Sequence, residues 1–140
     1  MGAWGYRPFE NDSAGDWLGA LIEEPMVKAI LKALKKVKPN YWNFEEGIAA
    51  ASLLAENCRS GRHPNLGYYA LEYGVFAWGV LAIEVIQKQE TWVSGFDDPE
   101  KMRAQLKSLR RSLLSLQSSE RKRQAKALSC LVYPKAKTAA

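Results

Sequence analysis

The stretch NLGYYALEYGVFAWGVLAIEVIQ, residues 65–87, is the most apolar part of the chain and decides the fold. Only Glu72 and Glu84 carry charge within it, and aromatic side chains recur along its first half. A helix this long that is apolar nearly all round must be covered on most sides, by other helices or by lipid. We expect residues 66–87 to form one continuous core helix, with the rest of the chain packed around it.

Two glycines, Gly74 and Gly79, lie inside this run, where each costs about 1 kcal/mol of helix propensity relative to alanine. Another interaction has to offset that loss. Ala70, Gly74, Trp78 and Ala82 step by four, so they share one narrow face made mostly of small residues. We interpret this face as a line along which another helix approaches closely.

A membrane span is the alternative interpretation of the same run, because a span needs about 20 mostly apolar residues. Glu72 argues against a span, since a carboxylate is expensive inside lipid. The amphipathic segments elsewhere in the chain provide the cover that a core helix needs in water. We therefore expect this stretch to be buried by its own chain.

The first part of the chain predicts two amphipathic helices. Residues 13–23 place apolar side chains on one face behind a run of capping residues. Pro25 suits the first turn of a second helix, which ends before Pro39. The second helix carries lysines opposite its apolar side or at its C-terminal end, where they favour the helix dipole. We interpret them as a solvated face: Lys28, Lys32, Lys35, Lys36 and Lys38.

A third helix is expected over residues 43–60. Asn43 followed by Glu46 resembles a capping box, and Gly61 is a natural C-terminal stop. Small residues along this helix allow a neighbour to come close. Beyond the core stretch, residues 90–98 predict a loop whose apolar side chains pack against the bundle: Trp92, Val93 and Phe96.

The last helix begins with a well-formed start signal, in which Asp97 or Asp98 caps the helix and Pro99 opens it. It continues or restarts to about residue 131. Its apolar residues alternate steps of four and three, which is a heptad-like seam. The seam consists of Met102, Leu106, Leu109, Leu113 and Leu116.

The two ends of the chain lack helical patterning. Glycines and a proline interrupt the first dozen residues, where Trp4, Tyr6 and Phe9 supply aromatic rings. We expect an extended segment whose rings fill one side of the bundle. Residues 134–140 form a basic tail too polar to pack, which we expect to be disordered. With 140 residues, the chain fits one all-α domain of five or six helices over residues 1–133.

The formal net charge of +5 hides an asymmetry along the chain. Residues 1–98 carry 9 Lys and Arg against 13 Asp and Glu, whereas residues 99–140 carry 11 against 2. The basic end suits an acidic partner. The hydrophobic fraction of 47% and charged fraction of 25% are ordinary for a globular protein, which excludes a wholly disordered chain.

The N-terminus lacks the basic region and apolar core of a secretory signal, so a cytoplasmic location is the expectation. Tyr6 stands where a myristoylation signal has Ser or Thr, so we expect no lipid anchor. Cys58 and Cys130 are interpreted as reduced, buried thiols, with a disulfide as the alternative. With a single histidine they form no zinc pattern, and we expect no metal and no cofactor.

The opening MGAWGYRPFENDSAGDWL resembles the start of the small bacterial proteins grouped as domain of unknown function 4259. Those proteins open with Met-Gly-x-Trp-Gly, followed by Phe, an acid, Asn-Asp, and shortly Asp with Trp or Phe. The matching positions are Met1, Gly2, Trp4, Gly5, Phe9, Glu10, Asn11, Asp12, Asp16 and Trp17. The stretches EEGIAAASLLAENCRSG and ETWVSGFDDPEKMRAQLKSLRRSL are similar to later parts of the family, so that the resemblance reaches about residue 114. It implies a compact, mainly helical bacterial domain with no assigned reaction, although the basic end departs from the family's more acidic character.

The densest polar group of the chain lies beside the aromatic opening. Next to Trp4, the side chains of Arg7, Asn11, Asp12 and Asp16 could line a pocket in which carboxylates do acid/base work or hold a cation. Alternatively, Asn11 and Asp12 cap the first helix, and Arg7 pairs with a nearby acid. We favour the structural interpretation, because the motif immediately precedes a helix.

Glu72 and Glu84 form a second candidate group, since they lie on nearly one side of the expected core helix. Buried carboxylates have raised pKa values and concentrate at functional sites. Facing a cleft with His63, they could bind a ligand; paired with basic residues, they would be structural, which we favour. His63 and Cys58 would form a nucleophilic pair only if the thiolate were exposed. We expect Cys58 to be buried.

Seven basic residues on the last helix are the strongest charge feature. Such a stripe suits phosphate backbones and would give steep salt dependence. A solvated helix surface is the alternative, and aromatic residues that stack on bases are absent from this region. The candidate basic surface consists of Lys107, Arg110, Arg111, Arg121, Lys122, Arg123 and Lys126.

Three functions remain open from the sequence. The leading hypothesis is a non-enzymatic module that binds another protein or a second copy of itself through the leucine seam. The second is binding of nucleic acid or another acidic surface by the basic end. The third is a small hydrolase or lyase that uses Asp12, Asp16 or Glu72. Phosphate-binding loops, the metalloprotease helix motif and nucleophile elbows are missing from the sequence.

Overall fold

The computed structural model describes residues 19–39 and 43–132. This part of the chain is all-α, as predicted, with six α-helices, one short π-helix and no strand. The predicted aromatic segment, the start of the first helix and the tail at 134–140 lie outside the described residues. The elements are η1 Gly19–Glu23, α2 Glu24–Lys35, α3 Phe44–Ser60, α4 Leu66–Glu72, α5 Val75–Gln87, α6 Glu90–Ser94 and α7 Pro99–Val132.

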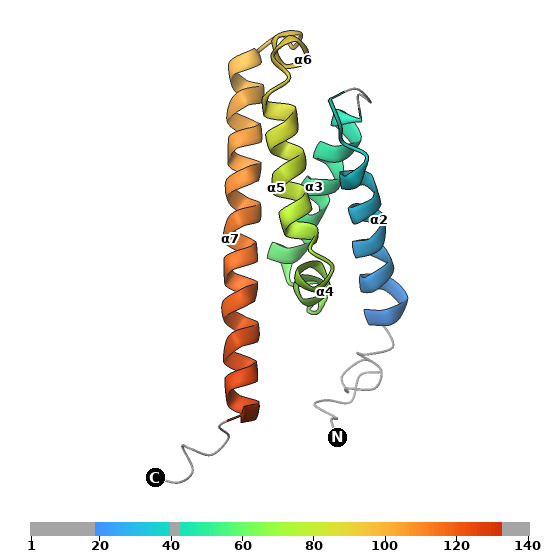
Figure 1. The fold of residues 1–140 in the computed structure, drawn as a ribbon, viewed down its shortest axis with the longest axis vertical. Helices are drawn as coiled ribbons and strands as arrows, with labels where there is room; N and C mark the ends of the chain where they lie inside the picture. Colours follow the sequence, from blue (N-terminus) through green and yellow to red (C-terminus); the bar gives the residue numbers. More distant parts are fainter. Residues whose placement is uncertain (1–18, 40–42, 133–140) are drawn as a thin grey trace.

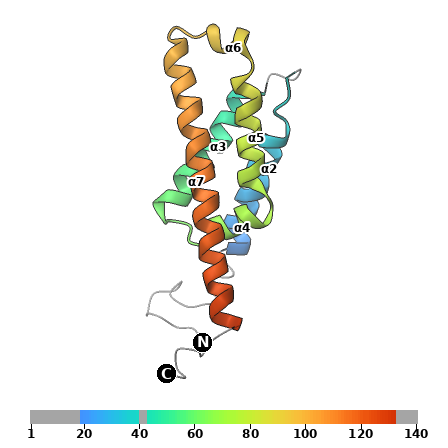
Figure 2. The same cartoon turned by 60° about the vertical axis from the view of Figure 1, so that its left-hand side comes forward.

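The body of the protein consists of the long helices α2, α3, α5 and α7 (Figure 1). Helices α3 and α5 each pack against both α2 and α7, whereas no contact joins α2 to α7 within the described residues. Helices α2 and α7 therefore occupy opposite sides of the bundle. Helix α7 is the longest element, and its C-terminal end runs past α4 and out of the bundle (Figures 1 and 2).

The apolar stretch is the centre of the fold, but it is not the single helix that its composition predicts. The stretch divides into α4 and α5, which are bent by 72° at the break between them. Gly74 adopts φ +70°, a left-handed conformation that glycine enters at little cost. The amide of Gly74 donates to the carbonyl of Leu71 and ends α4, and the amide of Trp78 donates to the carbonyl of Gly74 and begins α5.

The core surrounds α5. Its buried side chains, among them Phe76, Ile83 and Ile86, pack with buried residues of α2, α3 and α7. The expected small-residue face through Gly74 is wrong, because the helix breaks at that residue. Close approach occurs instead at Gly79, where an added Cβ would come within 3.0 Å of a methyl of Leu113.

The leucine seam of the last helix faces this core. Leu106 and Leu113 are fully buried, and Met102, Leu109 and Leu116 pack against the core from the edge. The seam is thus used inside the protein, so Leu106 and Leu113 cannot contact a second copy. Self-association remains a prediction only for other surfaces.

The ends of α3 agree with the sequence pattern, but the capping box does not form. Gly61 terminates the helix with φ +73°, as expected for a C-terminal stop. Asn43 precedes the helix without capping it through its side chain. Its Nδ2 instead donates to the carbonyl of Lys36 at 3.2 Å, which ties the start of α3 to the end of α2.

The segment expected to be a loop before the last helix contains the short helix α6. Val93 is buried, and Trp92 packs edge-on against both Phe44 and Phe96. The start signal of α7 is confirmed for Asp98, whose Oδ1 accepts the backbone N–H of Lys101 at 3.1 Å. Helix α7 then continues without interruption to Val132.

None of the helices in the described ranges is both long and apolar enough to cross a membrane by itself. The pair α4 and α5 meets the length and composition criteria only when its two bent halves are taken together.

Candidate functional site

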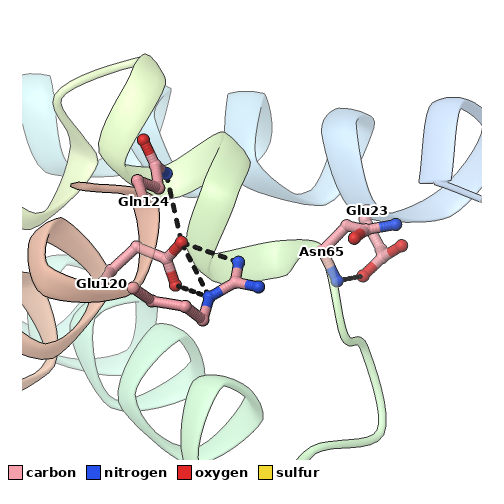
Figure 3. Close-up of polar contacts among 5 residues, drawn as sticks. Glu23, Asn65, Glu120 and Gln124 are labelled. Carbon is pink, nitrogen blue, oxygen red and sulfur yellow. Dashed lines mark hydrogen bonds and ion pairs between the residues drawn. The ribbon is translucent and has the colours of Figure 1, made fainter. Parts of the chain in front are cut away.

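Two carboxylates are buried among the described residues, and both lie around the start of α4 (Figure 3). Glu23, at the end of η1, is 2% exposed and accepts the backbone N–H of Asn65 at 2.7 Å. Asn65 immediately precedes α4, so this hydrogen bond fixes the point where the chain enters the helix. Glu23 is accordingly a structural group that joins η1 to α4.

Glu120, on α7, is the second buried carboxylate and belongs to a small polar network. Its Oε2 accepts hydrogen bonds from Arg123 Nη2 at 2.7 Å and from Gln124 Nε2 at 3.1 Å. Gly67 of α4 leaves the space that this carboxylate occupies, because a Cβ there would collide with Glu120. The absence of a side chain at position 67 therefore allows an acid to lie between α4 and α7.

A cavity of about 260 Å³ adjoins this network, where the end of α3 and the start of α4 meet α7. Cys58, His63, Gly67, Glu120 and Arg123 line it together with apolar side chains. The structure thus brings Cys58 and His63 to one cavity, although the sequence separates them by a helix end. No hydrogen bond joins the two side chains within the described part of the chain.

The thiol of Cys58 is poorly suited to act as a nucleophile. Burial, reinforced by the negative charge of Glu120, raises the pKa of Cys58 from 9.0 to about 11. A thiol with that pKa is almost entirely protonated at neutral pH, and the thiolate is the reactive form. The Cys58 thiol that lines the cavity is therefore not an activated nucleophile. The expectation of buried cysteines is partly wrong, since Cys58 is half-buried and Cys130 is exposed, and both are free.

A second hollow opens on the other side of Arg123, where α7 leaves the bundle. This α7 groove has a volume of about 540 Å³ and is mostly apolar. Leu128 is 60% exposed and Tyr68 of α4 is 43% exposed, so neither side chain is covered by the described fold. The groove is lined by Tyr68, Arg123, Gln124, Ala125, Ala127 and Leu128.

The seven basic residues predicted as one surface all lie on α7, but they do not share one environment. Arg110 pairs with Glu84 of α5 through Nη2 at 2.7 Å, and Arg123 pairs with Glu120. The remaining five are exposed and make no ion pair with any described residue: Lys107, Arg111, Arg121, Lys122 and Lys126. At 3.6 residues per turn, all of these except Arg121 fall on the face of α7 opposite the leucine seam.

The carboxylates singled out from the sequence do not form a buried pair. Glu72 is exposed, and its hydrogen bond raises the pKa of the Tyr68 phenol. Glu84 is a partly exposed member of the ion pair with Arg110. Among the described residues, Glu72 lines neither the cavity beside Glu120 nor the α7 groove. Trp4, Arg7, Asn11, Asp12 and Asp16 lie outside the described residues.

Glu120 has a signal in the sequence, because it continues the spacing of the leucine seam. Steps of three and four lead from Leu113 through Leu116 to Glu120, so an acid occupies the next position of an apolar seam. Glu23 had no comparable signal. No group of three or more His, Cys, Asp or Glu side chains in the described ranges is placed to hold a metal ion.

Comparison with known proteins agrees with the opening motif. The sequence model of a family described as domain of unknown function (DUF4259) matches residues 2–128. The chain belongs to this family. The DUF4259 match extends from the opening motif through the bundle to Leu128 in the α7 groove. Searches of curated proteins and of solved structures found no match.

Proposed function

We propose that this DUF4259 protein is a non-enzymatic interaction module that binds an acidic, amphipathic segment of another protein in the α7 groove. The observation that carries the proposal is the free end of α7. Between Arg121 and Cys130 every side chain except Gln124 is exposed, although the helix continues unbroken. A helix of this length outside a bundle gains little from packing unless something covers it.

The composition of the free end indicates the chemistry of the partner. Leu128 and Tyr68 offer an uncovered apolar contact, which is typical of an interaction site when polar residues surround it. Arg123 lies in the groove, and Arg121, Lys122 and Lys126 add positive charge around the same helix end. Apolar contact with surrounding positive charge fits a partner helix that has leucines on one face and carboxylates on its flanks.

A synthetic peptide tests this proposal directly. The probe is a 15-residue amphipathic helix with leucines on one face and glutamates on the flanks, labelled for fluorescence anisotropy. We expect saturable binding, and we expect Leu128→Ala to weaken it by about tenfold, as for a central apolar contact. Leu53→Ala is the matched control, because Leu53 is an exposed leucine on α3, 45% accessible and away from the groove. Equal effects of the two substitutions, or no binding at all, would contradict the proposal.

Nucleic-acid binding by the basic residues of α7 is the second candidate. The supporting observation is that five of the seven candidate residues make no ion pair within the described chain. The test uses Lys122→Glu with Lys126→Glu, since reversal at Arg110 would also break its ion pair with Glu84. This candidate predicts weaker retention of the double variant on heparin and DNA, and unchanged retention would remove it.

A further inference from the structure

A second basic surface lies on the opposite side of the bundle from α7. Most of its residues are exposed lysines of α2 and of the turn that follows it. Lys32 and Lys36 make no ion pair with any residue in the described ranges. The sequence pattern favours a solvated face here, but two structural features indicate a binding surface. We call this set the α2 surface: Lys32, Lys35, Lys36, Lys38, Asn43 and Trp78.

The first feature is a hollow that gathers positive charge. It has a volume of about 330 Å³, and the described residues that line it are four lysines and Asn43. Lys32 and Lys36 both line this hollow without an ion pair to any described residue, so their like charges repel each other and an anion seated between them would relieve the repulsion. A carboxylate is absent from the described lining, which therefore favours an anionic ligand.

The carbonyl groups at the C-terminal end of α2 also bear on whether an anion can bind there. Free carbonyls make a helix C-terminus negative. Here the carbonyl of Lys36 accepts Asn43 Nδ2 at 3.2 Å, and the carbonyl of Leu34 accepts the amide of Val37 at 3.1 Å. These donors satisfy two of the carbonyls at the end of α2, which reduces the negative charge that this helix end presents to an anion.

The second feature is aromatic. Lys35 Nζ lies 5.4 Å from the centroid of the Trp78 ring on α5, and Lys28 Nζ lies 5.7 Å from that of Tyr73. Trp78 remains 38% exposed beside the lysine hollow. Proteins that bind single-stranded nucleic acid combine clustered cations, which hold the phosphates, with an aromatic ring on which a base stacks.

We propose that the α2 surface binds single-stranded nucleic acid, with phosphates in the lysine hollow and a base stacked on Trp78. The ligand is single-stranded because the bases of a duplex are already stacked on one another and cannot reach a protein ring. This site lies across the bundle from the α7 groove and is independent of the peptide site.

The experiment measures the affinity of the full chain for a 15-nucleotide oligothymidylate by fluorescence anisotropy over a range of salt concentrations. We expect Lys32→Glu with Lys36→Glu to weaken binding by about tenfold or more and to reduce the salt slope, since each lost phosphate contact removes about 0.7 from that slope for single strands. Trp78→Ala should weaken binding by about tenfold through loss of stacking. Both lysine side chains are exposed and make no ion pair with a described residue, so the fold should survive, as circular dichroism would verify.

The matched control is Arg62→Glu with Lys101→Glu, two exposed residues outside both the α2 surface and the candidate basic residues of α7, which changes the net charge by the same amount. Unchanged affinity of this control supports the α2 surface. Loss of affinity in the control alone, or no binding by the unmodified protein, overturns the proposal. Duplex DNA and inorganic polyphosphate are parallel probes. Equal affinity for either of them, together with no effect of Trp78→Ala, overturns the assignment to single strands.

Discussion

A single glycine determines how the apolar stretch is used. Gly74 has φ +70°, and a Cβ added to it would meet nothing within 4 Å. Glycine is therefore needed at position 74 for its backbone conformation and not for lack of space. Propensity arguments count a glycine inside a helical pattern as a cost, and they do not distinguish it from a glycine that ends one helix and begins another. For that reason the division into α4 and α5 could not be predicted from the sequence.

Substitution of Gly74 by alanine distinguishes a continuous helix from a break at this residue, because the two predict opposite changes in the free energy of unfolding. With a left-handed residue at this position, Gly74→Ala should lower the free energy of unfolding by about 1–2 kcal/mol. Gly74→Asn should cost less, because asparagine tolerates this conformation better. The measurement is urea denaturation followed by circular dichroism. A continuous helix would instead gain about 1 kcal/mol from alanine, so a stabilised Gly74→Ala variant would contradict the structure.

The thiol of Cys58 should be protected by its environment. Its pKa is raised to about 11, so at pH 8 iodoacetamide should modify the exposed Cys130 at least about tenfold faster. The difference should vanish in urea. Glu120→Gln should speed the modification of Cys58, because it removes a negative charge that opposes the thiolate. Equal rates for the two cysteines in the folded protein would show that Cys58 is not in this environment.

The same pKa shift links Cys58 to stability. Because the folded state raises the pKa, it favours the protonated thiol over the thiolate. This contribution is fully present below the unfolded value of 9.0 and is lost as the pH rises towards 11. Cys58→Ala should therefore flatten the decline in stability across that alkaline range.

At the scale of elements, the local end signals were right at two helix ends and wrong at a third. Gly61 and Asp98 mark helix ends, and the structure confirms both. Helix α6 was missed because five residues are too few to show a helical period. The capping box does not form, because the side chain of Asn43 donates instead to the carbonyl of Lys36 on the preceding helix. The capping pattern within residues 43–46 does not reveal this hydrogen bond.

Adjacent leucines on α7 test how the helix faces the core. Leu113 is fully buried, whereas Leu114 is 39% exposed. Leu113→Ala should destabilise the protein by about 2–5 kcal/mol, since it leaves a cavity beside Gly79 and Leu34. Leu114→Ala should change stability by about 0.5 kcal/mol or less. Thermal denaturation of the two variants would reveal a rotated helix if their order were reversed.

At the scale of the whole molecule, the fold places its two basic surfaces apart. Helices α2 and α7 lie on opposite sides of α3 and α5, so a protein segment on one surface and a nucleic acid on the other need not compete. The sequence predicted the all-α class, the family and the basic end. It could not predict the α2 surface, because Lys35 and Trp78 come together only through the packing of α2 against α5.

The proposed function requires that the end of α7 be an uncovered binding surface. Amide hydrogen exchange with and without the leucine–glutamate peptide tests this directly. In the protein alone, residues 121–130 should exchange much faster than the part of α7 that carries Leu106 and Leu113, because only the latter is packed on the core. Saturating peptide should protect residues 121–130 and the start of α4 around Tyr68. Equal protection along α7 in the protein alone, or no change on adding the peptide, would contradict it.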